Sequence, residues 1–205
     1  MVNAFWLDRD LDLAARWLVD RHVTSSVFEC SMVLTTAARL RGYPDEVRYF
    51  THPDHPLTRW AAEAYDNWDL LRRYTRAAHR EWRYRWDHDE AERHACWAAV
   101  ESLDDARIEA LEWPGRPGDP PQVTGRWHAD DYVDAYRRYY ANDKRHLFRW
   151  SKDRTAPPWI DEYAVERSET GGEEGDGSET DEEEVDRSET DEEEVDRSET
   201  DEEEV

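Results

Sequence analysis

The sequence predicts an all-α protein: a single irregular bundle of about five helices over residues 1–165, followed by a disordered acidic tail over residues 166–205. Apolar residues in the first part recur every three or four positions, which is the period of a helix with one buried face. Almost no stretch there alternates with the period of two that a half-buried strand requires. The second part repeats a ten-residue acidic unit, as in RSETDEEEVD, and contains almost no apolar side chains that could be buried in a core.

Residues that start and stop helices place the expected elements. Asp10 and Asp12 precede the first apolar positions and can cap a helix there, while Gly42 and Pro44 end the second helix. A loop rich in proline and glycine occupies residues 113–124. We therefore expect helices over 11–18, 23–41, 56 or 58 to 85, 89–111 and 130–150.

Charge divides the chain at the same point. The formal net charge is −24, and residues 166–205 hold 22 acidic and three arginine side chains, so −19 belongs to the tail and −5 to the body. Like charges repel, and at most one valine per repeat cannot offset the entropy of ordering the chain. Two roles stay open for such a tail. It is either a solubilising, salt-adapted appendage, or a nucleic-acid mimic that binds basic partners or competes for the body itself.

The basic residues are unusual, because only Lys144 and Lys152 among 27 are lysine. This arginine-rich, acid-rich composition resembles that of proteins from salt-loving archaea and their viruses. No apolar run reaches about 18 residues and no basic-then-apolar leader is present, so we expect a cytoplasmic protein, in an archaeal or virus-infected host cell, with no membrane span. Cys30 and Cys96 are expected to be reduced thiols in the core.

The most suggestive chemical segment contains Asp20, Arg21, His22 and Glu29. His22 and Glu29 are seven residues apart, nearly two helical turns, so on one helix they share a face. A carboxylate and an imidazole that face one cleft can perform acid/base chemistry. The plainer alternative is that His22 bonds a backbone carbonyl and Glu29 pairs with an arginine.

Three segments in a shared order resemble the phage pyrimidine-dimer DNA glycosylase/AP lyase family: LVDRHVTSSVFECSMVL at 18–34, HPLTRWAAEAYDNWDLLRRYTRAAHREW at 55–82 and YRRYYA at 136–141. In that family an Asp, a His and a Glu stand at the spacing of Asp20, His22 and Glu29, and the Glu is catalytic. Phe28 and Met32 stand here where the family has arginines that grip phosphates. The ends of the body also resemble a set of phage and archaeal proteins for which modified thymines are the implied substrates.

The resemblance implies a Schiff-base mechanism. The amine of Val2, after removal of Met1, attacks the sugar C1′, and Glu29 stabilises the sugar cation and moves protons, with His22 and Asp20 beside it. An α-amine suits this step because its pKa near 8 leaves a useful fraction unprotonated, whereas an ordinary lysine near 10.4 is nearly all protonated. Lys144 is the alternative nucleophile.

Basic residues alternate with rings near the end of the body, which suits a surface that binds phosphates and replaces stacking lost when a base is extruded. The alternative is a core stripe with an ion-paired outer face, and the stretch 72–86 leaves the same two alternatives open. The residues expected to contact DNA are Arg21, Arg137, Arg138, Tyr139, Tyr140, Lys144, Arg149 and Trp150.

No cofactor and no metal are expected, because neither HExxH nor CxxC occurs, although several histidines lie near acidic residues. Two function hypotheses follow. The first is an enzyme on DNA, an N-glycosylase with or without AP lyase activity that acts on damaged or modified pyrimidines. The second is a non-catalytic nucleic-acid-binding or protein-adaptor module whose acidic tail mimics DNA.

Overall fold

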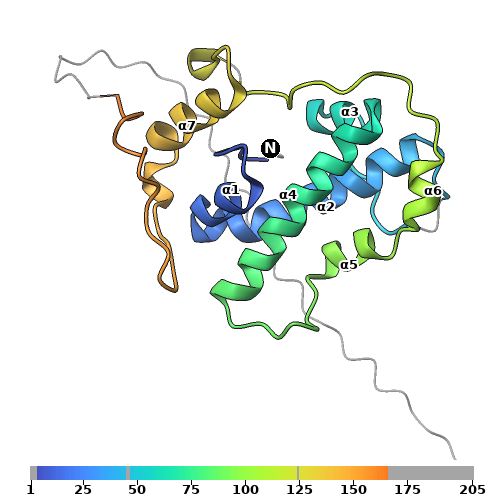
Figure 1. The fold of residues 1–205 in the computed structure, drawn as a ribbon, viewed down its shortest axis with the longest axis horizontal. Helices are drawn as coiled ribbons and strands as arrows, with labels where there is room; N and C mark the ends of the chain where they lie inside the picture. The colour runs from blue at the N-terminus through green and yellow to red at the C-terminus, as the bar shows by residue number, and fades with distance from the viewer. Residues whose placement is uncertain (1–3, 45–46, 124, 166–205) are drawn as a thin grey trace, which may run out of the picture. The chain divides into compact units, whose positions relative to one another are not determined.

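A computed structural model describes residues 4–44, 47–123 and 125–165, which belong to one compact unit. Within these ranges the protein is all-α, as predicted, and contains no strand (Figure 1). The acidic tail predicted at residues 166–205 lies outside the described residues. The α-helices are α1 (Leu11–Trp17), α2 (Asp20–Leu40), α3 (Pro56–Glu63), α4 (Tyr65–Arg85), α5 (Ala95–Glu101), α6 (Asp105–Glu109) and α7 (Tyr132–Asp143), and two 3₁₀ turns are η1 (Gly125–Trp127) and η2 (Arg145–Leu147).

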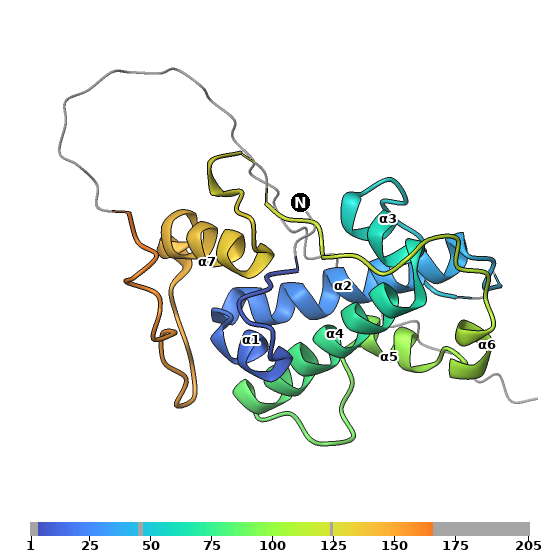
Figure 2. The same ribbon diagram turned by 45° about the horizontal axis from the view of Figure 1, so that its top comes forward.

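The two longest helices, α2 and α4, form the centre of the unit. α2 packs against α3, α4 and α5, and α4 also packs against α1. In both ribbon views α7 lies at one end of the unit and α6 at the other (Figures 1 and 2). The buried segment Ala4–Leu7 contributes to the same core. The largest fully buried side chains are aromatic, so much of the ring content serves packing, and each such ring stabilises the fold by roughly 1.5–3 kcal/mol.

Local signals place the ends of the first two helices. The Asp10 carboxylate accepts hydrogen bonds from the backbone N–H groups of Asp12 and Leu13, so Asp10 caps α1. α2 ends at Leu40, and Gly42 follows with a φ of +90°, a backbone conformation that glycine adopts without strain. α2 begins at Asp20, three residues earlier than expected, so Asp20 and His22 belong to it.

The prediction of a single helix from residue 56 or 58 to 85 is wrong, because the helix is interrupted at Ala64. Ala64 has extended backbone angles (φ −142°, ψ 147°) between α3 and α4. Carbonyl groups at the end of α3 bond to groups elsewhere: Asn67 Nδ2 donates to the Trp60 oxygen at 2.9 Å, and Gly115 N–H donates to the Glu63 oxygen at 2.9 Å. Hydrogen bonds from other parts of the chain therefore take the place of the helical ones.

The expected helices over 89–111 and 130–150 are also longer than those observed. His94 caps α5, and the Asp104 carboxylate accepts from Arg107 N–H and starts the separate α6. Such short polar side chains compete with a continuing helix for backbone groups. α7 ends at Asp143, and the chain then leaves the helix so that the Arg149 carbonyl accepts from Asp20 N–H at 2.9 Å.

Candidate functional site

α2 carries the predicted acid/base pair on one helix. His22 is buried at 6% exposure, and Glu29 lies seven residues further along and is half-buried. Seven residues correspond to about 10 Å along the helix axis and nearly two turns, so the two side chains share a face as expected. Val2, the predicted nucleophile, lies outside the described residues.

Hydrogen bonds to Tyr140 determine which ring nitrogen of neutral His22 carries the proton. Val19 N–H donates to the Tyr140 hydroxyl oxygen at 2.8 Å, and that hydroxyl lies 2.9 Å from His22 Nδ1. Tyr140 is fully buried, and leaving its O–H without an acceptor would cost about 1–3 kcal/mol. Its proton therefore goes to Nδ1, and neutral His22 carries its own proton on Nε2. The Phe5 ring stacks on the imidazole with a centroid distance of 4.2 Å and holds its plane.

The surroundings keep His22 uncharged. Burial, followed by the positive charges of Lys144, Arg21 and His146, lowers its pKa to about 3. An imidazole that stays neutral at physiological pH cannot act as an acid from its charged form. His22 is thus equipped to donate a hydrogen bond from Nε2.

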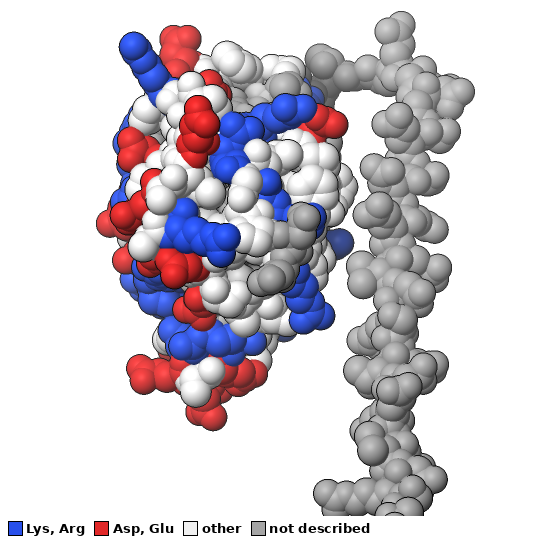
Figure 3. Space-filling model, turned by 90° about the vertical axis from the view of Figure 1, so that its right-hand side faces the viewer, with Lys and Arg blue, Asp and Glu red and all other residues white. Residues whose placement is uncertain are grey.

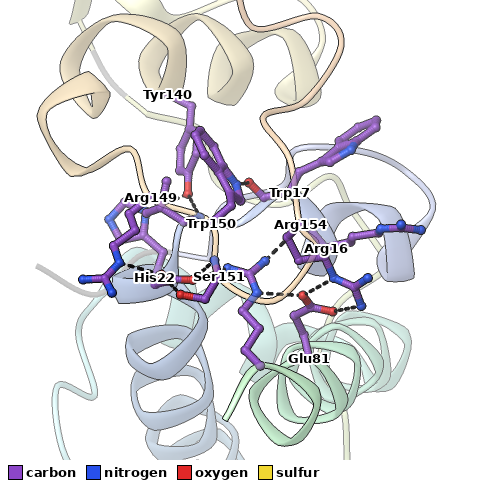
Figure 4. A network of polar contacts seen from close by, with 12 residues as sticks. Arg16, Trp17, His22, Glu81, Tyr140, Arg149, Trp150, Ser151 and Arg154 are labelled. Atoms are coloured by element: carbon purple, nitrogen blue, oxygen red, sulfur yellow. Dashed lines mark hydrogen bonds and ion pairs between the residues drawn. The ribbon is translucent and has the colours of Figure 1, made fainter. Parts of the chain in front are cut away.

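Asp20 has partners that the sequence did not reveal, among them Ser151 and Arg149, which Figure 4 labels. Its carboxylate accepts from Ser151 N–H at 2.9 Å and from the Ser151 hydroxyl at 2.7 Å, and Arg85 Nη1 donates to it at 3.0 Å. Arg149 adds a longer ion pair at 3.5 Å. Burial alone would raise the pKa of Asp20, but the hydrogen bonds from Ser151 and Arg85 hold it below the usual value. Asp20 therefore ties the chain after α7 to the start of α2.

A buried ion network, composed of Asp20, Glu81, Arg85 and Arg154, extends this connection. Arg85, whose side chain is 0% exposed, donates through Nε to Glu81 at 2.7 Å. Arg154 donates to both Glu81 oxygens, at 2.7 and 3.0 Å (Figure 4). The network joins α2, α4 and the segment after α7.

A tight turn between Ser151 and Arg154 is held by this network. Lys152 and Asp153 have φ angles of +53° and +56°, a left-handed conformation that costs roughly 1–2 kcal/mol per residue. Ser151 and Arg154 on either side are bonded to Asp20 and Glu81. No spacing or motif in the sequence links Ser151 or Arg154 to α2 or α4, so their bonds to Asp20 and Glu81 could not be predicted.

The predicted DNA-binding residues fall into two groups. The first group remains available to a ligand: no carboxylate of the described residues lies within 4.0 Å of Arg21, Arg138 or Lys144. Arg149 is 81% exposed. Tyr139 is half-buried with the Lys144 ammonium 5.0 Å from its ring centroid. We call Arg21, Lys144 and Arg149 the basic rim, because all three lie around the first turn of α2 that holds His22.

The second group is engaged in the fold. Arg137 donates to the Leu7 carbonyl and pairs with Asp8, each at 2.8 Å, and its guanidinium lies against Trp159. Trp150 Nε1 donates to the Trp17 carbonyl at 3.0 Å, and Tyr140 holds His22 as described above. These three side chains have structural partners, which is the alternative that the sequence left open for them.

The arginines of α4 also have partners within the fold. Arg72 and Arg73 pair with Asp69, Arg80 pairs with Asp12, and Arg83 donates to the Glu90 carbonyl. Most arginines of the stretch 72–86 are thus bonded within the fold, while Arg76 is exposed and its guanidinium lies 5.9 Å from the centroid of the Trp97 ring.

A hollow of about 400 Å³ lies elsewhere, between the segment after α2 and helices α5 and α6. Its lining includes Arg48 and Arg107, together with Tyr43, Val47 and Leu103, and none of the predicted site residues. Figure 3 shows the side of the unit where α6 lies, with both basic and acidic side chains set among uncharged ones.

Within the part of the chain that the structure describes, no group of three or more His, Cys, Asp or Glu side chains is arranged to hold a metal ion. None of the described helices is long and apolar enough to cross a bilayer.

No family model, curated protein or solved structure matches this chain. A function for this protein must therefore be argued from the side chains of α2 and of the basic rim.

Proposed function

We propose that the body of this protein binds DNA and releases a damaged or modified pyrimidine as an N-glycosylase, with or without AP lyase activity. The observation that supports the proposal is the position of His22 and Glu29 on one face of α2, with the basic rim around its first turn. The cations of the basic rim suit phosphates, and a carboxylate on the same helix face as a neutral hydrogen-bond donor suits a sugar that develops positive charge.

The proposed reaction follows from those groups. A primary amine, from Val2 or from Lys144, attacks the sugar C1′ as the bond from C1′ to the base breaks. The amine loses a proton, the departing base gains one, and Glu29 carries it between them. The nitrogen lone pair then forms the C1′=N bond as the C1′–O4′ bond breaks, and O4′ takes a proton from water, which leaves the ring-opened iminium, the protonated Schiff base. His22 Nε2–H contributes a hydrogen bond to a substrate oxygen.

The test is covalent trapping by borohydride, which reduces the iminium to a stable amine. Wild-type protein is mixed with oligonucleotides that carry an ultraviolet dimer, a modified thymine or an abasic site. We expect a trapped complex with wild-type protein and a loss of at least about 100-fold with Glu29→Gln, the scale of acid/base catalysis. Glu101→Gln is the matched control, since Glu101 is the last residue of α5 and forms an exposed ion pair with Arg93.

A second function is favoured by one observation, the engagement of Asp20 in the buried ion network. One of the three residues that match the glycosylase motif thus has a structural role here. A non-catalytic DNA-binding module would keep that role and the basic rim without using Glu29. DNA binding without trapping on any of the substrates would support this module over the enzyme.

A further inference from the structure

The surface of α2 presents an exposed aromatic ring beside the proposed catalytic carboxylate. Phe28 is 44% exposed, although it lies in the middle of the central helix. Its neighbours on the solvent side recur at helical spacing: Arg21, Thr24 and Phe28 are exposed, and Ser25, Glu29 and Met32 are half-buried.

A single exposed apolar residue is common in proteins, so exposure alone says little about Phe28. Its surroundings say more. Arg21 lies two turns before it on the same stripe, with no carboxylate of the described residues within 4.0 Å, Met32 lies one turn after it, and Glu29 is the next residue. Cations that bind phosphates, next to an accessible apolar ring, form the combination that binds unstacked nucleic acid.

We propose that Phe28 enters the base stack of DNA and takes the place left by the extruded nucleotide, while Glu29 faces that nucleotide's sugar. Apolar side chains such as phenylalanine act as wedges of this kind between base steps. Consecutive residues on a helix lie 3.8 Å apart and point about 100° away from each other, so one side chain can fill the gap while the other meets the sugar beside it. This inference rests on the proposed function, because it requires that α2 faces DNA.

The wedge assigns separate contacts to separate parts of the surface. Phe28 is exposed and Met32 is half-buried one turn after it, so α2 offers apolar contacts beside Glu29. The phosphate contacts then come from the basic rim, at the start of α2 and after α7. The two kinds of contact are thus separated along the same surface.

Binding to a duplex with one tetrahydrofuran abasic analogue tests the wedge. This probe has an empty place in the stack, and it has no base to release and no reactive C1′ oxygen, so it reports binding without chemistry. Fluorescence anisotropy compares it with the intact duplex at about 0.1 M salt. We expect wild-type protein to prefer the abasic duplex, Phe28→Ala to lose about tenfold of that affinity, and Phe28→Trp to keep it.

Phe50→Ala is the matched control, because Phe50 is 47% exposed but lies beyond the C-terminal end of α2 against Arg39. The affinity of Phe50→Ala for the abasic duplex should equal that of wild-type protein. All variants should have the melting temperature of wild-type protein, since neither ring is in the core. Equal binding by Phe28→Ala and wild-type protein would overturn the wedge and leave the proposed function standing. The same holds if Phe50→Ala loses as much as Phe28→Ala. If wild-type protein binds neither duplex, both the wedge and the proposed function are wrong.

Discussion

At the scale of single residues, hydrogen-bond partners decide what each side chain can do. Tyr139 and Tyr140 are neighbours on α7 and were both expected to contact DNA, yet only Tyr139 is accessible. Tyr140 is buried and sits between Val19 N–H and His22 Nδ1. It acts through His22 as a positioning residue, because its hydroxyl proton forces the imidazole proton onto Nε2.

Tyr140→Phe should change the tautomer of His22. Without the hydroxyl, Nδ1 has no donor from Tyr140, and we expect the imidazole to populate both neutral tautomers where wild-type protein shows Nε2–H alone. Long-range nitrogen–proton NMR spectra of the imidazole measure this directly, with no substrate present. Tyr136→Phe is the control, since its hydroxyl donates to the Pro121 carbonyl and has no bond to His22. An unchanged Nε2–H tautomer in Tyr140→Phe would show that Phe5 and packing suffice to hold it.

At the scale of elements, the buried ion network explains how a segment without regular structure is held in place. Asp20 and Glu81 come from α2 and α4, and each accepts hydrogen bonds both from Arg85 and from the turn after α7. A buried charge whose partner is removed remains in a poorly solvating site, which costs far more than the loss of a surface pair. The network therefore makes the position of the basic rim depend on α4.

Glu81→Gln should lower the free energy of unfolding by about 3 kcal/mol, because Arg85 and Arg154 lose their shared counter-charge. Chemical denaturation monitored by circular dichroism measures the change. Glu101→Gln removes an exposed pair with Arg93 and should cost less than about 1 kcal/mol. Similar small losses in both variants would mean that water compensates the charges around Glu81.

At the scale of the whole molecule, the uneven charge of the chain governs its expected behaviour toward DNA. The tail holds −19 of the −24 charges, while the body combines −5 with the basic rim, in which Arg149 is 81% exposed and neither Arg21 nor Lys144 has a carboxylate partner among the described residues. A polyanion attached to such a body raises the local concentration of a competitor for DNA. Salt screens this competition, since the Debye length falls from about 10 Å at 0.1 M to about 3 Å at 1 M.

Deletion of residues 166–205 should leave the melting temperature unchanged and raise DNA affinity modestly at low salt. The composition of these residues predicts that they bury no apolar surface, so their loss should not affect the core. The gain in affinity should fade as salt approaches 1 M. Calorimetry and DNA titrations of the full and shortened chains at several salt concentrations measure both effects. A large drop in melting temperature would show that the tail packs on the body, and equal affinity at low salt would exclude the competition.

Features that depend on near neighbours along the chain could be predicted from the sequence. The period of apolar residues made the fold all-α, Asp10 and Gly42 placed helix ends, and the spacing of His22 and Glu29 put them on one face. These features depend on contacts within about two helical turns, so local pattern is sufficient to predict them.

Which polar groups meet over long distances in the chain depends on how the helices and loops pack, and local patterns do not predict it. Asp20 is bonded to Ser151, 131 residues away, and Gly115 takes the Glu63 carbonyl that a continuous helix would have used. The sequence holds 25 arginines, and no spacing rule says which of them will find a carboxylate. Burial makes an unpaired charge or carbonyl costly, so the packed core selects those pairs. The same packing leaves Arg21, Lys144 and Phe28 open to a ligand.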